Sequence, residues 1–553
     1  MYGLVVWLKA ETADSLVSDF RSLLSDLSNE SIDQERSTAE VISEVKTRLF
    51  RSKTPWLIVF DNIEDDDLLE RFLPRGAGAK GHVIVTQRRH IDRKYETISM
   101  ACFDVSESVD LLRMTAGNNL DETDTSIVEQ ICEKLGNLPL ALSIAATYMV
   151  KSDVSGSEYL SRFLDAEKCG TGLNNPVERS LSLTLPLLEP TTIDVLHLLA
   201  YLSAEMLSKP IIRMLIGHKA KYEHSKRLSD VQTKLLRASA LACCGLTVGG
   251  VMLSIRRRQT ASIALVAGAS ILASTWTFLS SSIGTSKPLK GAQRQKSSTD
   301  FDALEYDQCD KAWSQLKSFS LLSVEGGRGS IHRLTQKAMV SFQSSSERRQ
   351  FWSICMDTLS ELWDFSPDDS STWKESLLHL EHLKSCLGFA EEFSTESDVL
   401  VFAKLCRECG IAQSMVLNQF AESESSLRLS LRLVGKTRAR RAAVEKVQTL
   451  NELSKVLRFQ GRFSEAEACL DEAVALSKRY SIDYIADSYY EFGVLSSKRH
   501  QLDKAIVYLE RSLDCSPGYD AKRASSLHQL AAVYIGETCL GRLLCLGGLN
   551  FDE

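Results

Sequence analysis

The stretch that decides the fold is an apolar run that ends abruptly in an acid and an amide, Trp56-Leu57-Ile58-Val59-Phe60-Asp61-Asn62. Five apolar residues in a row are typical of a strand buried on both faces, as in a parallel sheet. Such sheets bind ligands beyond the carboxyl ends of their strands, where we expect Asp61 to lie. A carboxylate there can hold the Mg²⁺ ion of a nucleotide. The alternative is a buried strand that runs into an acidic surface turn.

Two further stretches follow in chain order. Gly81–Arg89 is a short β-branched run that ends in polar residues, and Thr86 and Arg88 are well placed to contact a phosphate beyond a parallel strand. Leu135–Leu142 contains a glycine and Pro139, which indicate a turn before an apolar helix that we expect to reach about Met149.

Together these stretches resemble the NB-ARC family of STAND-type signalling ATPases, the nucleotide switches of NOD-like and apoptotic receptors. Trp56–Asn62 resembles the Walker B strand of the family, Val83–Arg88 its sensor strand, and Leu135–Leu142 its GLPLAL motif. The resemblance implies a bound ADP or ATP with Mg²⁺, and the residues it assigns to that ligand are Asp61 as the metal ligand, Thr86 and Arg88 beside the phosphates, and Pro139 against the adenine.

The phosphate-binding loop of such proteins, G-x-x-x-x-G-K-[ST], has no match in the chain. The nearest glycine-rich stretch, Gly76–Gly81, lacks the spacing and is interpreted as a surface turn. Val6-Trp7-Leu8 resembles the family strand that follows this loop, so we expect a chain truncated before the loop, or a degenerate natural form. Asn62 stands where many ATPases carry a second acid, and an amide cannot accept a proton. We therefore predict at most a slow ATPase.

The composition is that of an ordinary multidomain globular protein. The 553 residues are 44% apolar and 25% charged, which supports two to four domains. A net charge of −7 gives no reason to expect nucleic acid as the main partner. Fourteen cysteines without a regular framework indicate reduced thiols in a cytosolic or nuclear compartment, and we expect a cytoplasmic location. Cys406-x-x-Cys409 is a lone pair without a second pair at zinc spacing, so no metal is expected there.

The predicted fold is a parallel α/β nucleotide-binding core, a partial P-loop NTPase, followed by a helical domain, a winged helix and an all-α solenoid of tetratricopeptide type. Within the core we expect helices at Ser15–Leu27, Ala39–Phe50 and Asp104–Met114, and a strand around Glu96–Met100. The proposed boundaries are 1–120 for the core, 121–190 for the small helical domain, 191–345 for the winged helix, 346–400 for a helical linker and 401–553 for the repeats.

Near the end of the predicted winged helix, Gly326-Gly327-Arg328-Gly329 indicates a hairpin turn. Ile331-His332-Arg333 then resembles the family's MHD-type element, whose histidine reaches the β-phosphate of ADP and holds the closed state. Arg333 departs from the acid of plant receptors, which puts that acid's locking role in doubt. The alternative for His332 is a histidine that simply opens a helix. We interpret His197 as a packed or capping histidine rather than a ligand.

The winged-helix region is interrupted by an apolar insert at 238–286, which contains three arginines, Arg256 to Arg258, between two uncharged runs. Each run approaches the length that spans a bilayer as a helix. Three interpretations stay open: a membrane hairpin, a soluble or poorly ordered insertion, and an artefact of the gene model. A membrane partner is expected only through this insert.

The C-terminal half repeats itself. Small residues and large apolar residues recur in three sets, which are Phe420, Ser423, Leu427, Ser430; Phe463, Ala466, Leu470, Ala473; and Leu502, Ala505, Leu509, Ser512. The spacing is 43 residues from the first set to the second and 39 from the second to the third. Leu453, Leu457 and Gly461 match Phe492, Ser496 and His500 in the same way. This pattern resembles tetratricopeptide repeats of the long type found in many fungal and animal NB-ARC proteins. Leu527–Tyr534 would begin a further unit, and the Gly-rich end suggests an incomplete array.

Two functions follow from these observations. The first is an ADP/ATP-dependent signalling switch of the NOD-like receptor type, as in innate immunity, in which the repeats sense a protein ligand and the output is homo-oligomerisation. The second is a non-catalytic repeat scaffold that binds proteins and carries a degenerate nucleotide domain. The effector and the ligand are not predictable from the sequence, because solenoid surfaces vary freely.

Overall fold

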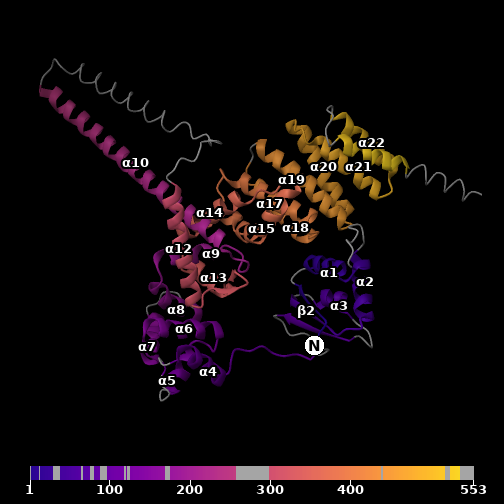
Figure 1. The fold of residues 1–553 in the computed structure, drawn as a ribbon. Helices are drawn as coiled ribbons and strands as arrows, with labels where there is room; N and C mark the ends of the chain where they lie inside the picture. Colours follow the sequence, from indigo (N-terminus) through magenta and orange to yellow (C-terminus); the bar gives the residue numbers. More distant parts are fainter. Residues whose placement is uncertain are drawn as a thin grey trace, which may run out of the picture. The chain divides into compact units, whose positions relative to one another are not determined.

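The computed structural model (Figure 1) describes most of the chain, namely residues 2–10, 13–28, 38–63, 66–74, 80–87, 96–117, 120, 125–168, 175–256, 298–437, 440–516 and 523–535. The chain divides into two compact units. Unit 1 comprises 1–102, 201–203 and 359–553, and unit 2 comprises 103–200 and 204–358. A small parallel sheet with its helices, a mostly helical region and C-terminal helical repeats follow one another along the chain, as the sequence predicts.

The N-terminal part of unit 1 is a three-stranded parallel sheet in the order β1-β2-β3, made of β1 (Leu4–Lys9), β2 (Trp56–Ile63) and β3 (Gly81–Gln87). Four of the five apolar residues that begin β2 are buried and Leu57 is half-buried, so the prediction of a buried strand is confirmed. The register pairs Trp7 with Val59 and Val59 with Ile84. The sheet is parallel, and β2 is its central strand.

Three amphipathic helices supply the core on one face of this sheet: α1 (Ala13–Ser28), α2 (Thr38–Arg51) and α3 (Asp66–Phe72). Phe20 of α1 lies edge-to-face on Phe72 of α3, with ring centroids 4.9 Å apart. The indole Nε1 of Trp56 donates to the carbonyl of Leu49 at 2.9 Å, which joins β2 to the end of α2. The opposite face of the sheet leaves Trp7 63% exposed.

One predicted strand is absent. Residues 96–100 have no regular secondary structure and are exposed, with Ile98 at 82%. Val, Ile and Thr favour strands only where a neighbouring strand and a core face receive them. The described residues offer this segment neither, so its β propensity has no effect. The prediction of a strand around Glu96–Met100 was wrong.

Unit 2 begins with α4 (Val105–Ala116), α5 (Thr125–Lys134), α6 (Pro139–Ser152), α7 (Gly156–Lys168), α8 (Pro176–Thr184) and α9 (Pro190–Leu199). Of these, α4 and α6 confirm the helices predicted at Asp104–Met114 and after Pro139. Asp104 caps α4, because its carboxylate accepts the N–H of Glu107 at 2.8 Å while the Glu107 side chain accepts the N–H of Asp104 at 2.9 Å. This reciprocal pair fixes the start of α4.

The predicted hairpin is also present. β4 (Ser323–Glu325) and β5 (Arg328–Ser330) form an antiparallel pair, and both glycines of the turn have positive φ, +55° for Gly326 and +78° for Gly327. Leu207 exchanges two backbone hydrogen bonds with Gly329, at 2.9 and 2.7 Å, so a third segment joins the hairpin. The hairpin lies between α12 (Ser298–Ser318) and α13 (Arg333–Ser341).

His197 is a packed histidine, as expected. Its ring stacks on Phe351 of α14 (Ser345–Leu362) with centroids 5.0 Å apart, and its Nδ1 lies 2.9 Å from the Gln343 amide nitrogen. Burial lowers the pKa of His197, the nearby carboxylates of Asp194 and Glu347 oppose this shift, and Lys219, which is ion-paired to Asp194, adds to it. The ring is therefore held neutral inside unit 2.

The apolar insert is described only in part. Helix α10 runs from Lys209 to Arg256 and so enters the 238–286 tract, and the remainder of the tract lies outside the described residues. No helix in the described ranges is long and apolar enough to cross a membrane.

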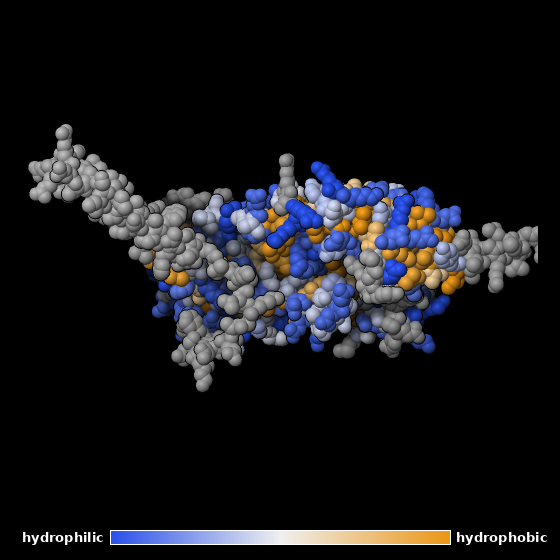
Figure 2. Space-filling model, turned by 90° about the horizontal axis from the view of Figure 1, so that it is seen from above, coloured by the Kyte–Doolittle hydropathy of each residue, from blue (hydrophilic) through white to orange (hydrophobic). Residues whose placement is uncertain are grey.

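The C-terminal part of unit 1 is helical from α15 (Trp373–Leu387) and the short α16 (Ala390–Phe393) onward. Its paired helices are α17 (Val399–Met415) with α18 (Phe420–Val434), α19 (Arg440–Phe459) with α20 (Phe463–Tyr480), and α21 (Ile485–Lys498) with α22 (Leu502–Asp514). A further helix over 523–535 follows. On the face seen in Figure 2, apolar and hydrophilic residues are interspersed over this array.

The residues that repeat in the sequence are those that the helix pairs bury. Ser423, Ala466 and Ala505 are all fully buried, as are the leucines four residues beyond each. Gly410 of α17 and Gly493 of α21 lie where the helices of a pair cross, because a Cβ at Gly493 would meet Leu509 Cγ at 2.6 Å. Small residues therefore let the two backbones approach, which confirms the predicted repeat architecture.

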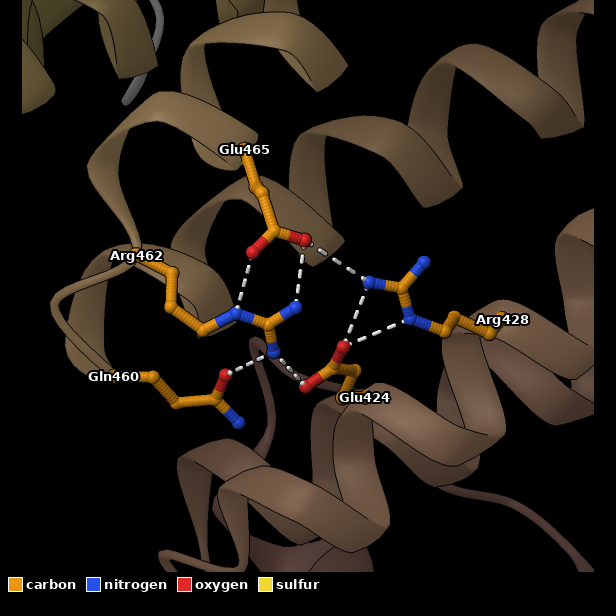
Figure 3. Close-up of polar contacts among 5 residues, drawn as sticks. All are labelled: Glu424, Arg428, Gln460, Arg462 and Glu465. Carbon is orange, nitrogen blue, oxygen red and sulfur yellow. Dashed lines mark hydrogen bonds and ion pairs between the residues drawn. The ribbon is translucent and has the colours of Figure 1, made fainter.

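Successive helix pairs are joined by charged side chains (Figure 3). Arg462, which precedes α20, binds Glu424 of α18 at 2.7 Å and Glu465 at 2.6 Å, and Arg428 also contacts both carboxylates. Two arginines and two glutamates alternate in space, so each charge has opposite neighbours. The network links α18 to α20, and the partial exposure of its groups limits the contribution of each single ion pair.

Candidate functional site at the carboxyl end of the sheet

The predicted metal ligand and one predicted phosphate contact do meet. At the carboxyl end of the sheet, the Thr86 hydroxyl of β3 donates to Asp61 Oδ1 of β2 at 2.5 Å. The backbone N–H of Asn62 donates to the same hydroxyl oxygen at 2.8 Å. Parallel pairing brings the two strand ends to one edge, and a register shift between Phe60 and Ile63 turns the chain there. The result is a compact polar group at the edge where parallel sheets bind ligands.

Asn62 explains the local geometry. Its φ is +61°, in the left-handed region, where asparagine is several-fold enriched among residues other than glycine. This conformation coincides with the bulge and lets the Asn62 N–H reach Thr86. Sequence reasoning weighed Asn62 only as the replacement for a catalytic acid. An asparagine directly after a buried strand was the available signal for its backbone role.

The group fits a magnesium ion in the chemistry of its donors. Mg²⁺ prefers carboxylate and hydroxyl oxygens, and proteins often hold it through only one or two carboxylates plus water and phosphate. Asp61 Oδ2 accepts no hydrogen bond from any residue in the described ranges. The same ranges contain no cluster of three His, Cys, Asp or Glu side chains that could form a closed metal centre. Asp61 would therefore need a nucleotide's phosphates to complete the coordination.

Pro139 is the first residue of α6 and is exposed. The turn before it depends on two left-handed residues, Gly136 with φ +65° and Asn137 with φ +52°. The Asn137 carbonyl accepts the N–H of Phe103 at 3.2 Å, which brings the residue before the α4 cap beside the start of α6. The GLPLAL-like stretch thus forms a rigid helix start with an exposed imide ring.

His332 opens α13. Its Nδ1 accepts the N–H of Leu334 at 3.1 Å, so the imidazole caps the helix. Partial burial lowers the pKa of His332, although the residue as a whole is exposed, and the neutral ring is the form that can accept at Nδ1. The structure therefore shows the helix-opening role for this residue. A contact with a β-phosphate stays a prediction.

The predicted site residues are distributed as follows. Asp61 and Thr86 lie together in unit 1, whereas Pro139 and His332 lie in unit 2. Arg88 lies outside the described residues. The convergence of all these groups on one adenine nucleotide stays a prediction. Cys406 and Cys409 are free, buried thiols of α17, and burial raises the pKa of each.

Among solved structures, the chain is similar to the crystal structure of the Signal Transduction ATPase with Numerous Domains (STAND) protein with a tetratricopeptide repeat sensor from Pyrococcus horikoshii. The match covers 97% of this chain and 78% of that chain, with 11% sequence identity and a TM-score of 0.33. That protein combines the two parts named by the sequence resemblance. A TM-score of 0.33 is too low to establish a common fold, so the proposals below rest on the residues themselves.

A search of curated proteins found no match. A family model for the tetratricopeptide repeat matches residues 445–518, which comprise most of α19 and all of α20, α21 and α22. The matched segment coincides with the helix pairs whose buried small and large residues recur in the sequence. Residues 445–518 of this chain are therefore tetratricopeptide repeats.

Proposed function

We propose that this chain is a nucleotide-dependent signalling switch of the NOD-like receptor type, with the repeats as the sensor of a protein ligand. The observation that carries the proposal is the Asp61–Thr86 pair at the carboxyl end of a parallel sheet. An acid and a hydroxyl at that edge are the groups that hold Mg²⁺ and sense phosphate in nucleotide sites. The repeats support the sensor role, because paired helices of this type present extended surfaces to proteins.

The remaining parts of the switch are assigned from the same resemblance. Pro139 would cover the adenine, Arg88 would contact the phosphates, and His332 would stabilise the closed, ADP-bound form. The hairpin β4–β5, its bridge to Leu207 and the flanking helices support a winged-helix domain within 191–345. Ligand binding on the repeats followed by ADP–ATP exchange would release the domains to form a homo-oligomer.

Hydrolysis is expected to be slow or absent in this polypeptide. Its sequence contains no G-x-x-x-x-G-K-[ST] loop to wrap the phosphates. Asn62 cannot act as a general base, and its backbone N–H is bonded to Thr86. A cytoplasmic location is expected from the sequence, because its cysteines show no regular disulfide framework.

The test is ADP binding to the purified chain with and without Mg²⁺. The variant Asp61→Asn keeps an oxygen that can accept the Thr86 hydroxyl but removes the charge that attracts the metal. We expect Mg²⁺-dependent ADP binding to weaken at least tenfold in Asp61→Asn. The exposed Asp26→Asn on α1 is the matched control and should bind like the parent.

A second function is favoured by the repeats alone. If the chain binds peptides but neither ADP nor ATP, with or without Mg²⁺, it is a non-catalytic repeat scaffold with a degenerate nucleotide domain. Equal ADP binding by the parent and Asp61→Asn would also reject the role of Asp61.

A further inference from the structure

A pocket of about 330 Å³ opens between α15, α17 and α18, before the segment that the repeat family model matches. Its size falls in the range of small-ligand sites. The interior is mainly apolar, with Leu387 from α15 and Leu429 from α18 on its walls and Cys406 of α17 among its lining residues. None of the proposed nucleotide contacts belongs to it.

One face of α18 is directed into this pocket. Ala421, Ser425, Leu429 and Arg432 recur at intervals of three and four residues, which places them in a row along the helix. The opposite side of the helix buries Leu427 within the repeats. Helix α18 therefore uses one face for the core of its repeat and presents the other to an open pocket.

The two cations at the pocket are already paired with acids. Lys384 Nζ lies 3.0 Å from Glu381 Oε1, and Arg432 Nε lies 2.9 Å from Glu391 Oε1. The pocket is thus not a site of strong positive charge. A free inorganic anion would have to compete with both carboxylates.

The polar lining contains donors and an acceptor together. Lys384, Arg432 and the exposed Ser425 hydroxyl can donate, and the Glu422 carboxylate accepts. A peptide backbone matches such a mixture, because every amide carries both an N–H donor and a C=O acceptor. A fatty acid or another free carboxylate only accepts and would be repelled by Glu422.

We propose that this pocket binds a peptide segment of a partner protein by taking up one large aliphatic side chain between Leu387 and Leu429, with the backbone held by the polar groups of the pocket. A leucine or methionine side chain fills such a space without a polar atom to satisfy. Burial raises the pKa of the Cys406 thiol, so this group stays protonated and apolar at neutral pH. The inference rests on the sensor part of the proposed function and not on nucleotide binding.

The test begins with a phage-displayed random peptide library selected on the full chain in reducing buffer. We expect enriched peptides to share one leucine, methionine or isoleucine at a fixed position. Calorimetry then compares variants with a synthetic copy of the strongest peptide. Ala421→Trp fills the pocket and should raise the Kd at least tenfold, and Arg432→Ala should raise it about threefold or more.

The matched control is Ala475→Trp, at an exposed position of α20 outside the pocket, which should leave the Kd unchanged. Circular dichroism checks that each variant is folded. If Ala421→Trp does not fold, the proposal is tested with Arg432→Ala and Glu422→Ala instead. An unchanged Kd for the peptide in both variants overturns it. It is also overturned if no peptide is enriched, if the peptides lack a common aliphatic residue, or if hexanoate binds as tightly as the peptide.

These outcomes are separable from the nucleotide switch. Peptide binding that depends on Ala421 and Arg432 in a chain that binds no ADP would support the pocket and reject the switch. Mg²⁺-dependent ADP binding, together with a peptide affinity that is unchanged by substitution of Ala421 or Arg432, would support the switch and reject the pocket.

Discussion

Replacing Gly493 with alanine probes the contact that brings α21 and α22 together. The added Cβ would lie 2.6 Å from Leu509 Cγ and 2.7 Å from Leu509 Cδ2, and at an ordinary 3.4 Å from the Ala505 carbonyl. Overpacking of this kind costs about 1–3 kcal/mol, whereas alanine gains about 1 kcal/mol over glycine in a helix. We expect a net loss of about 1 kcal/mol in the local stability of this helix pair.

The sharper form of the prediction is a double-mutant cycle with Leu509→Ala. Both close contacts of the new methyl group are with the Leu509 side chain, so shortening that side chain removes them. In the Leu509→Ala background, Gly493→Ala should therefore stabilise by about 1 kcal/mol, the helix-propensity term alone. The coupling between the two substitutions is then about 1–3 kcal/mol.

Gly410 supplies the comparison within the same chain. A Cβ there would meet Leu427 Cγ at 2.7 Å, but also the Ser423 backbone carbonyl at 3.2 Å. Because the contact with the Ser423 carbonyl is made by the backbone, no side-chain substitution removes it. Leu427→Ala should therefore restore only part of the stability lost in Gly410→Ala. Full rescue by Leu509→Ala is therefore expected at Gly493, and only partial rescue by Leu427→Ala at Gly410.

The assay is hydrogen exchange of the full chain followed by mass spectrometry, because it reports local stability in a protein with several units. A loss of about 1.4 kcal/mol lowers protection about tenfold, and α21 and α22 should show it while the sheet does not. Gly493→Ala with protection equal to or above the parent would refute the crossing contact. So would an equal loss in the Leu509→Ala background.

Two further predictions use the same measurement. Burial lowers the pKa of His197 and, less deeply in the fold, that of His332, so the unfolded state takes up protons first as the pH falls. The stability of unit 2 should therefore fall below about pH 6.5, and His197→Gln should reduce that dependence while His332 keeps part of it. Trp56→Phe removes the 2.9 Å indole bond to the Leu49 carbonyl, which keeps only the longer 3.3 Å bond from the Ser52 N–H, and should cost about 0.5–1.5 kcal/mol in the sheet region. Trp7→Phe, at a largely exposed position, should cost close to nothing, and equal losses for the two tryptophans would contradict the hydrogen-bond argument.

The elements predicted correctly are those whose evidence lies within a few residues. The β2 strand follows from an unbroken apolar run, the β4–β5 turn from two glycines, and the start of α6 from Pro139. The strand expected at 96–100 failed because strand formation depends on a partner elsewhere in the chain. Local propensity predicted each element only where local forces decide it.

The candidate site was predictable to the same degree. Asp61 and Thr86 could be placed together because parallel strands end at one edge, and the structure joins them with a hydrogen bond. Their relation to Pro139 and His332 depends on how separate units associate, which no local pattern encodes. The pocket beside α18 was missed because its lining comes from three helices and has no common motif.

The repeats show why a pattern of variable length could still be recognised. The turns within the three helix pairs each contain a residue with positive φ, and each is followed five residues later by the small buried residue of the crossing: Asn418 and Ser423, Gly461 and Ala466, His500 and Ala505. This offset is constant, whereas the distance from one pair to the next is 43 residues and then 39. The turn and the crossing cannot lengthen, because the close contact at Gly410 or Gly493 would be lost. The extra residues lie mainly within the helices, because α19 has 20 residues and α21 has 14, whereas the segments before them, 435–439 and 481–484, differ by one residue. The first helix of a pair can lengthen at its amino end, away from the turn and the crossing, without disturbing the close contact. The helix pair, and not the period, is therefore the repeated unit of packing along this chain.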